Sequence, residues 1–319
     1  MVTIDLITGF LGSGKTTFLK KYAEYLMDQG LHIGILENDF GAINVDMLML
    51  HELRGDQCEL EMIAGGCDAE SHRRRFRTKL ISMRMCGYDR VLVEPSGIYD
   101  VDEFFDVLRE EPLDQWYEIG NVIAILDARL ENNLSPQADY LLASEAANAG
   151  KVILSHADAA TRKQCEDTVA HLNRALEQLR CDRRIDPEKD ILQTNLTDLT
   201  KEDLQEVSKC GYRLESYRKM DLENGQSFDS LFFMEEKITS EALERAVPRL
   251  FADKSCGEVF RIKGFVKNKD GQWMELNATH DSRTLDPIAV GQEVLIVIGE
   301  HLQEDKIREL LKEEETCQS

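Results

Sequence analysis

Two patterns of apolar and polar positions alternate along the first two hundred residues. Short aliphatic and β-branched runs, typical of strands, are separated by longer segments with the period of a helix. The predicted strands are Val2–Thr8, His32–Glu37, Arg90–Glu94, Asn121–Asp127, Lys151–Ser155 and Asp190–Thr194. The predicted helices are Lys15–Gln29, Asp102–Leu108, Gln137–Ala149 and Arg162–Arg180. Because runs such as Val122–Leu126 are apolar on both faces, we predict a doubly wound α/β domain with a mainly parallel, covered sheet.

The pattern changes at a polar stretch, Asp221–Ser227. Beyond it we predict further strands and two helices: strands at Phe228–Met234, Glu258–Val266, Gln272–Asn277 and Glu293–Gly299, and helices at Ser240–Phe251 and Gln303–Glu314. A turn at 267–271 joins two of these strands. We therefore expect a first domain over 1–220 and a smaller α+β domain over 226–315.

Composition narrows the classes of function. The 319 residues include 38 Lys and Arg against 60 Asp and Glu, which gives a formal net charge of −22. We expect no nucleic-acid or membrane partner, because both partners bind basic surfaces and no apolar run approaches the roughly 18 residues of a membrane span. The N-terminus lacks a basic signal-peptide region. Eight cysteines without a CxxC pair indicate reduced thiols in a cytoplasmic protein.

The segment 9–17 reads GFLGSGKTT and matches the complete GxxxxGK[ST] phosphate loop between a strand and a helix. Backbone amides of such a loop surround phosphates at a helix N-terminus. We expect Lys15 to reach the β- and γ-phosphates and the Thr16 hydroxyl to bind Mg²⁺. The predicted nucleotide residues here are Gly9, Gly12, Ser13, Gly14, Lys15, Thr16 and Thr17. The first domain is thus predicted to have the P-loop NTPase fold.

Carboxylates follow two of the neighbouring strands. Glu94 ends one strand, and Asp39 follows another, two residues after Glu37. Strand ends in a parallel sheet converge at one edge, so we expect Thr16, Asp39 and Glu94 to form the Mg²⁺ shell or to orient the attacking water. Lys15, Asp39 and Glu94 are the predicted catalytic residues, with Glu37 the candidate should Asp39 have no role.

A base-recognition segment is predicted after the strand at 151–155. Ser155, His156 and Asp158 stand where a GTPase has Asn/Thr-Lys-x-Asp. Asp158 keeps the carboxylate that accepts from guanine N1–H and N2–H₂, and His156 can stack on the base in place of the lysine. Asn195, after the last strand of the domain, is the expected neighbour of the base.

In their order, these motifs resemble the CobW-type P-loop GTPases, relatives of the nickel chaperones UreG and HypB. The matching segments run through Gly9–Thr17, Glu37–Gly41, Gly65–Cys67, Glu94–Gly97, Asp158, Gly257–Phe265 and Gly291–Glu300. The resemblance covers nearly the whole chain. It implies a Mg²⁺-dependent GTPase with slow intrinsic turnover. It also implies a metallochaperone or cofactor-insertion factor whose nucleotide state controls delivery to a client metalloenzyme.

The family's Gly-Cys-x-Cys-Cys metal motif is incomplete here, because 66–70 reads GCDAE. Cys67 and His72, with Asp68 or Glu70, form a candidate transition-metal site, and the metal implied by the resemblance is Zn²⁺. Zinc sites usually need three or four protein ligands. We therefore expect the site to be weak, and the isolated monomer not to retain stoichiometric zinc, unless Cys58 or a second protomer in a homodimer completes the shell. The alternative is that Cys67 is a small buried residue at a turn.

Two further alternatives stay open. The basic stretch His72–Lys79 is either a solvated helix face or a surface that docks an acidic partner or supplies an arginine to nucleotide across a dimer. The protein itself is either a metallochaperone GTPase or a nucleotide-gated regulatory switch without metal delivery. A kinase-like P-loop enzyme is disfavoured by the Asp158 segment.

Overall fold

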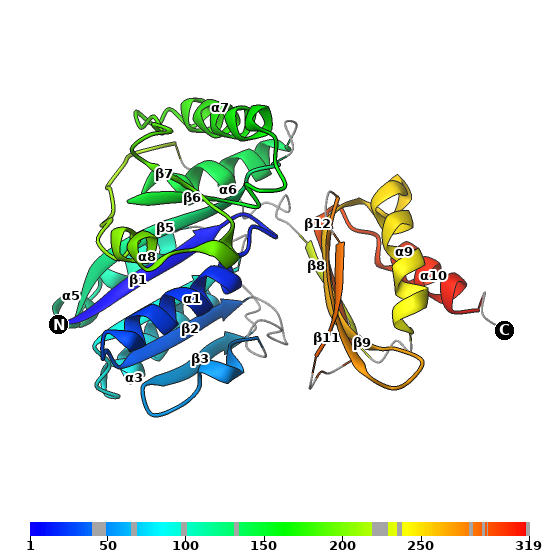
Figure 1. Cartoon of the computed structure of the whole chain (residues 1–319), viewed down its shortest axis with the longest axis horizontal. Helices are drawn as coiled ribbons and strands as arrows, with labels where there is room; N and C mark the ends of the chain where they lie inside the picture. Colours follow the sequence, from blue (N-terminus) through cyan, green and yellow to red (C-terminus); the bar gives the residue numbers. More distant parts are fainter. Residues whose placement is uncertain are drawn as a thin grey trace. The chain divides into compact units, whose positions relative to one another are not determined.

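The computed structural model of the protein describes residues 1–39, 49–64, 69–96, 101–130, 134–218, 229–234, 238–280, 283–288, 291 and 293–316. The chain separates into two compact units, Met1–Met220 and Asp221–Ser319. Each unit contains one sheet with helices packed on it (Figure 1).

The first unit is built on a seven-stranded sheet. Its strands are β1 (Val2–Gly9), β2 (Ile33–Asp39), β3 (Cys58–Ala64), β4 (Arg90–Pro95), β5 (Tyr117–Asp127), β6 (Lys151–Ser155) and β7 (Ile191–Gln193). They lie in the order β3-β2-β4-β1-β5-β6-β7, and every neighbouring pair is parallel. The predicted doubly wound parallel fold is therefore confirmed.

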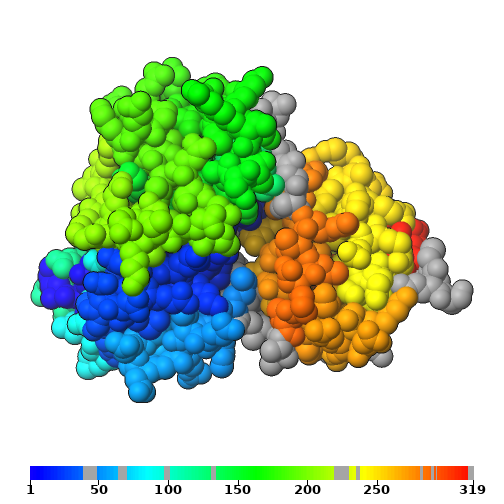
Figure 2. All heavy atoms as spheres, in the orientation of Figure 1, coloured from blue at the N-terminus to red at the C-terminus, as the bar shows by residue number. Residues whose placement is uncertain are grey.

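Helices cover both faces of this sheet. On one face α1 (Lys15–Asp28) contacts α8 (Lys201–Val207), and the blue residues of α1 meet the green residues around α8 in the space-filling view (Figure 2). On the other face, neighbouring helices contact one another in the series α3 (Ala69–Arg84), α4 (Val101–Leu108), α6 (Pro136–Ala147) and α7 (Arg162–Gln178). Short elements complete the unit: α5 (Leu113–Trp116), η1 (His51–Leu53) and η2 (Leu196–Asp198).

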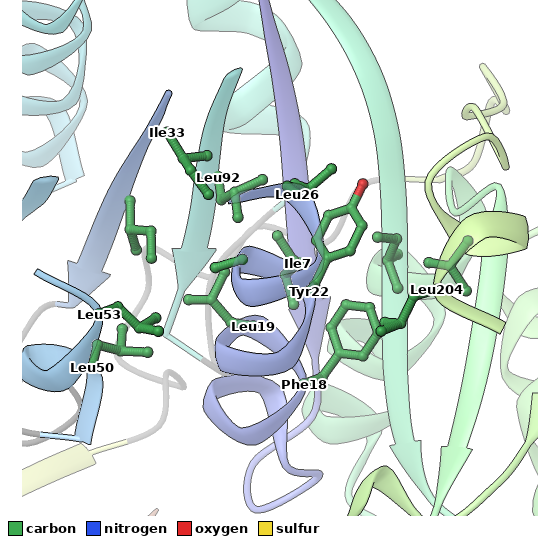
Figure 3. Packing of buried hydrophobic residues seen from close by; sticks show 14 of the residues in the cluster. Ile7, Phe18, Leu19, Tyr22, Leu26, Ile33, Leu50, Leu53, Leu92 and Leu204 are labelled. Carbon is green, nitrogen blue, oxygen red and sulfur yellow. The ribbon is translucent and has the colours of Figure 1, made fainter. Parts of the chain in front are cut away.

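The core under α1 follows the helical spacing of the sequence. Phe18, Leu19 and Tyr22 lie on the buried face of α1 and are fully buried, together with Ile7 on β1 and Leu92 on β4. Figure 3 shows Phe18, Leu19 and Tyr22 of the helix in one cluster with Ile7 and Leu92 of the strands. Burying large apolar side chains in this way is the main stabilising contribution to the unit.

A buried polar cluster lies within this core. The Asp5 carboxylate accepts a hydrogen bond from the Tyr22 hydroxyl at 2.8 Å and another from the backbone N–H of Asn121 at 2.8 Å. Arg90 lies 3.3 Å from the same carboxylate. Because each donor comes from a different element, the cluster fixes α1, β4 and β5 against β1.

The segment after α8 is hydrogen-bonded to β5 and to the ends of α6 and α7. The backbone N–H of Val122 donates to the carbonyl of Gly211 at 3.0 Å, and the N–H of Arg213 donates to the carbonyl of Asn148 at 2.9 Å. The N–H of Arg218 donates to a carbonyl at the end of α7 at 2.8 Å. These contacts lie away from the carboxyl ends of the strands.

The second unit has a five-stranded sheet. Its elements are β8 (Asp229–Met234), α9 (Ser240–Ala252), η3 (Lys254–Cys256), β9 (Glu258–Lys267), β10 (Trp273–Thr279), β11 (Arg283–Pro287), β12 (Val294–Glu300) and α10 (Glu304–Thr316). The strand order is β11-β10-β9-β12-β8 with antiparallel neighbours. Apolar residues of α9 and α10 share one core with this sheet. The predicted α+β character of this part is confirmed.

The described elements that the sequence pattern did not predict include β3, α8 and β11, besides the short α5, η1, η2 and η3. Strand β3 lies at a sheet edge, and its two acidic residues are paired, Glu59 with the Tyr88 hydroxyl at 2.5 Å and Glu61 with Lys79 at 2.7 Å. Helix α8 begins at a capping box formed by Thr200 and Asp203. In β3 and α8 polar side chains find partners in the fold, so these segments form without a strong apolar pattern.

Candidate phosphate and base site

The phosphate loop connects β1 to α1, and its glycines are required by geometry. Gly12 and Gly14 have φ angles of 77° and 92°, in the left-handed region, which glycine adopts without steric cost. A Cβ on Gly9 would lie 2.1 Å from the carbonyl oxygen of Ile125. The loop therefore lies tightly against β5, and its amides precede the N-terminus of α1, where anions are favoured.

Three predicted residues meet at this edge of the sheet. Lys15 is buried, and its ammonium donates to the Gly9 carbonyl at 2.8 Å. The Thr16 hydroxyl donates to Glu94 Oε1 at 2.8 Å. Glu94, near the end of β4, is itself buried. The structure thus brings a cation, a hydroxyl and a carboxylate to the same loop. Thr17 follows in the first turn of α1, half-buried.

Buried polar atoms around the loop indicate that the site is shaped for a polar ligand. Within the described residues, Thr8 Oγ1, Ser13 Oγ and both amide atoms of Asn38 are buried without a hydrogen-bond partner. Buried polar groups are normally paired, so this group is suited to partners supplied by a ligand. Hydroxyl and carboxylate oxygens are also the ligands that Mg²⁺ prefers, and the donors at Thr16 and Glu94 fit that ion. Asp39 ends β2, and its side chain lies outside the described part.

The ends of β5, β6 and β7 form the base side of the same edge. Asn195 Nδ2 donates to Asp158 Oδ2 at 3.4 Å, so these two predicted residues are neighbours. Ser155 is fully buried, and its hydroxyl donates to the carbonyl of Leu126 at 3.1 Å. Ser155 therefore supports the loop that presents His156 and Asp158.

Sequence reasoning missed Asp127 and Arg129, which hold His156. His156 Nδ1 lies 2.9 Å from Asp127 Oδ2, and Arg129 contacts both oxygens of the same carboxylate, at 3.1 and 2.9 Å. The available signal was the two charged residues at 127 and 129, just after the buried run Val122–Leu126. Burial would raise the pKa of Asp127, but hydrogen bonds from His156 and Arg129 outweigh burial and hold that pKa well below its usual range.

Glu145 is a further residue that the sequence did not single out. It lies on α6 with no exposed surface, and neither carboxylate oxygen has a hydrogen-bond partner among the described residues. Burial raises the pKa of Glu145 to about 8, although the charge of nearby Lys15 lowers it. A carboxyl group that is neutral near physiological pH therefore lies within electrostatic reach of the phosphate-loop lysine.

The candidate transition-metal residues fall into two groups. Cys67 and Asp68 lie outside the described residues. His72 is fully buried on α3, and its Nδ1 lies 3.2 Å from Glu103 Oε1 on α4. Over the ranges that the structure describes, no three His, Cys, Asp or Glu side chains gather as a metal site. The Cys67–His72 site stays a prediction.

The basic face of α3 is paired within the chain. Arg73 and Arg77 both contact Glu110, at 2.6 and 3.0 Å, and Arg74 pairs with Glu70 at 3.0 Å. These ion pairs favour the solvated-face interpretation of the basic stretch.

Comparison with known proteins places the chain among nucleotide-binding proteins. Residues 3–185 match the family described as "CobW/HypB/UreG, nucleotide-binding domain". Residues 230–314 match the "Cobalamin synthesis protein cobW C-terminal domain". No helix within the described ranges is long and apolar enough to cross a membrane.

Two curated relatives come from Escherichia coli (strain K12). Zinc chaperone YjiA is 28% identical over 54% of this chain and 55% of its own length. Zinc chaperone YeiR is 31% identical over 41% of this chain and 39% of its own. The chain thus spans about half the length of the curated relatives it matches. The crystal structure of Zn(II)-bound YjiA GTPase from E. coli aligns over 98% of both chains at 17% identity with a TM-score of 0.37.

Proposed function

Because the chain belongs to the CobW/HypB/UreG family of nucleotide-binding proteins, we propose that it is a Mg²⁺-dependent GTPase that serves as a metallochaperone. In this proposal the nucleotide state controls delivery of a metal, or of a metal-containing cofactor, to a client protein. The expected partners are a guanine nucleotide, the client and a second copy of the chain.

One observation carries the nucleotide part: Lys15, Thr16 and Glu94 meet at a loop whose glycines adopt left-handed geometry. Lys15 would move its ammonium from the Gly9 carbonyl to the phosphate oxygens, where its charge offsets theirs. Thr16 and Glu94, with Asp39, would hold Mg²⁺, which when bound neutralises charge on the β- and γ-phosphates. Glu94 or Asp39 would also orient the attacking water.

The base assignment rests on Asp158. Its carboxylate offers the acceptor pair that guanine's N1–H and N2–H₂ require and that adenine cannot satisfy, and Asn195 lies beside it. Ser155 would support this loop from within the core, and His156 would lie against the base. GTP is therefore the proposed substrate.

The chaperone part rests on the relatives. Two of them carry the name zinc chaperone, which makes Zn²⁺ the first metal to test as cargo. Cys67 and His72 are the proposed ligands, and a second copy would supply the rest of the shell.

The nucleotide proposal is tested by calorimetry with GTP, GDP and ATP in the presence of Mg²⁺, followed by phosphate-release assays. Lys15→Ala should abolish GTP binding, because it removes the main cation of the loop. Lys20→Ala is the matched control, since Lys20 lies on the same helix but pairs with Glu52 at 2.6 Å. Equal affinity for ATP and GTP would refute the guanine assignment, and unchanged binding by Lys15→Ala would refute the phosphate site.

A regulatory switch without metal delivery is the second candidate. It is favoured by Ala69 and Glu70, which stand in place of two family cysteines, and by the engagement of His72 with Glu103. Metal analysis after dialysis separates the two functions, with and without a non-hydrolysable GTP analogue. Zinc retained only with nucleotide, and lost in Cys67→Ala, supports the chaperone. No zinc in either state supports the switch.

A further inference from the structure

Asp127 and His156 come from the ends of adjacent strands. Asp127 ends β5 and lies opposite Ser155 in the parallel register with β6, so His156 is the first residue beyond the sheet on that side. The His156 Nδ1–Asp127 Oδ2 distance is 2.9 Å. The two strand-end turns are joined again by the backbone N–H of Ala128, which donates to the Ser155 carbonyl at 2.9 Å.

Every acceptor position of the Asp127 carboxylate is used inside the protein. Oδ1 accepts from the backbone N–H of Arg129 at 2.8 Å and from Arg129 Nε at 3.1 Å. Oδ2 accepts from Arg129 Nη2 at 2.9 Å and faces His156 Nδ1. Since the carboxylate is saturated by its own chain, it has no role in contacting a ligand directly. Its effect is on the side chains it holds.

His156 is in a backbone conformation that non-glycine residues rarely adopt. Its φ angle is 53°, in the left-handed region that costs an L-amino acid energy. Such strain persists where surrounding contacts hold it, and it gathers at functional positions. Here the side-chain contacts that hold it are the 2.9 Å pair with Asp127 and a longer contact, 3.4 Å, between His156 Nδ1 and Ser155 Oγ. About two fifths of the side chain remains exposed, beside the segment that contains Asp158.

We propose that Asp127 is the positioning residue of the base site: it fixes the orientation and the tautomer of His156, which lies against the purine of the bound nucleotide. This inference rests on the proposed binding of GTP. Arg129 completes the arrangement by holding the other side of the carboxylate.

The tautomer follows from the chemistry of the pair. An ionised carboxylate only accepts hydrogen bonds, so the nitrogen that faces it, Nδ1, carries the proton. The second nitrogen, Nε2, then has a free lone pair when the ring is neutral. A carboxylate partner selects imidazole tautomers in the same way at other sites. The imidazole ring therefore has a fixed orientation toward a ligand, and its Nε2 edge can accept a hydrogen bond when the ring is neutral.

A second Asp–His pair in the same unit provides a matched control. His171 Nε2 lies 2.7 Å from Asp139 Oδ1 between α7 and α6, and both side chains are more buried than those of the strand-end pair. Removing that carboxylate tests the general effect of breaking a buried Asp–His contact in this fold.

The test is a double-mutant cycle on the full chain. Affinities for GDP and for a non-hydrolysable GTP analogue are measured by calorimetry for wild type, Asp127→Asn, His156→Ala and the double variant, each confirmed as folded by its thermal unfolding curve. We expect each single variant to lose about 10-fold in affinity, equivalent to about 1.4 kcal/mol. The double variant should lose no more than either single variant, because Asp127 acts through His156. Affinity for inorganic tripolyphosphate with Mg²⁺ should stay unchanged, as it should for every nucleotide in Asp139→Asn.

Nitrogen-15 NMR of the histidine rings tests the tautomer without any variant of Asp127. The His156 signals, assigned with His156→Gln, should report a proton on Nδ1 in the neutral ring, whereas His171 should report one on Nε2. Losses that multiply in the double variant, an unchanged GDP affinity in Asp127→Asn, or a His156 proton on Nε2 would each overturn the inference while leaving GTP binding intact. Absence of guanine-nucleotide binding in wild type would instead overturn the proposed function, and this inference with it.

Discussion

Glu145 places a carboxyl group where the solvent cannot reach it, so its charge should act against folding. Burial raises its pKa from 4.5 to about 8. The folded state therefore binds a proton more tightly than the unfolded state, and stability falls as pH rises from the unfolded pKa through the folded one. We predict that Glu145→Gln removes this part of the pH dependence.

The size of the effect follows from the shift. One pH unit of pKa difference corresponds to about 1.4 kcal/mol, so the wild-type free energy of unfolding should fall by about 3 kcal/mol between pH 4.5 and pH 7. Above pH 8 the total loss reaches about 5 kcal/mol, which is the largest value the shift allows. At pH 5 the loss should be no more than about 1 kcal/mol, because the unfolded state has only begun to release its extra proton there.

The assay is urea unfolding at pH 5, 7 and 9, followed by tryptophan fluorescence. The chain has two tryptophans, so a Trp273→Phe background leaves Trp116 to report the first unit alone. Glu145→Gln should be the more stable protein at pH 9 by several kcal/mol. Glu24→Gln, at an exposed position on α1, makes the same change in net charge and should leave the pH profile unaltered. Parallel profiles for wild type and Glu145→Gln would refute the reasoning.

Three shorter predictions concern the core and the loop. Tyr22→Phe removes the hydroxyl that donates to Asp5 and should lower the free energy of unfolding by about 1–3 kcal/mol, measured in urea with the same Trp116 probe. Gly14→Ala should weaken GTP binding in calorimetry, since its φ is 92° and its Cβ would lie 2.6 Å from a leucine side chain; Gly30→Ala, at φ 82° with open space around it, should bind GTP normally. Asp39→Asn should keep nucleotide binding at high Mg²⁺ but lower turnover in a phosphate-release assay. An unchanged rate would show that Asp39 has no catalytic role, and Glu37 on β2 would become the candidate.

The fold was predictable where burial leaves a direct trace in the sequence. Strands β4, β5 and β6 are buried on both faces, so their apolar runs identify them without tertiary information. Strand β3 leaves no such trace. Its Glu59 and Glu61 resemble those of a solvated segment until Tyr88 and Lys79, which arrive from later in the chain, pair with them.

The site residues also differ in how far the sequence predicts them. A local motif specifies Lys15 and Thr16. Strand β4, which pairs with β1 in the sheet, brings Glu94 to them. Asp127 belongs to the site only because β5 and β6 are neighbours in register, which the sequence does not state. The left-handed conformation of His156 depends on that same pairing.

The fastening of residues 211–218 has a mechanical consequence. The last described part of the first unit is hydrogen-bonded to a residue in the middle of β5 and to residues at the ends of α6 and α7, whereas the phosphate loop is at the carboxyl edge. Tension applied through the connecting chain would have to open these hydrogen bonds one after another before it strained the sheet. The hydrogen bonds of residues 211–218 would therefore bear a force applied through the connecting chain before it reached the phosphate loop.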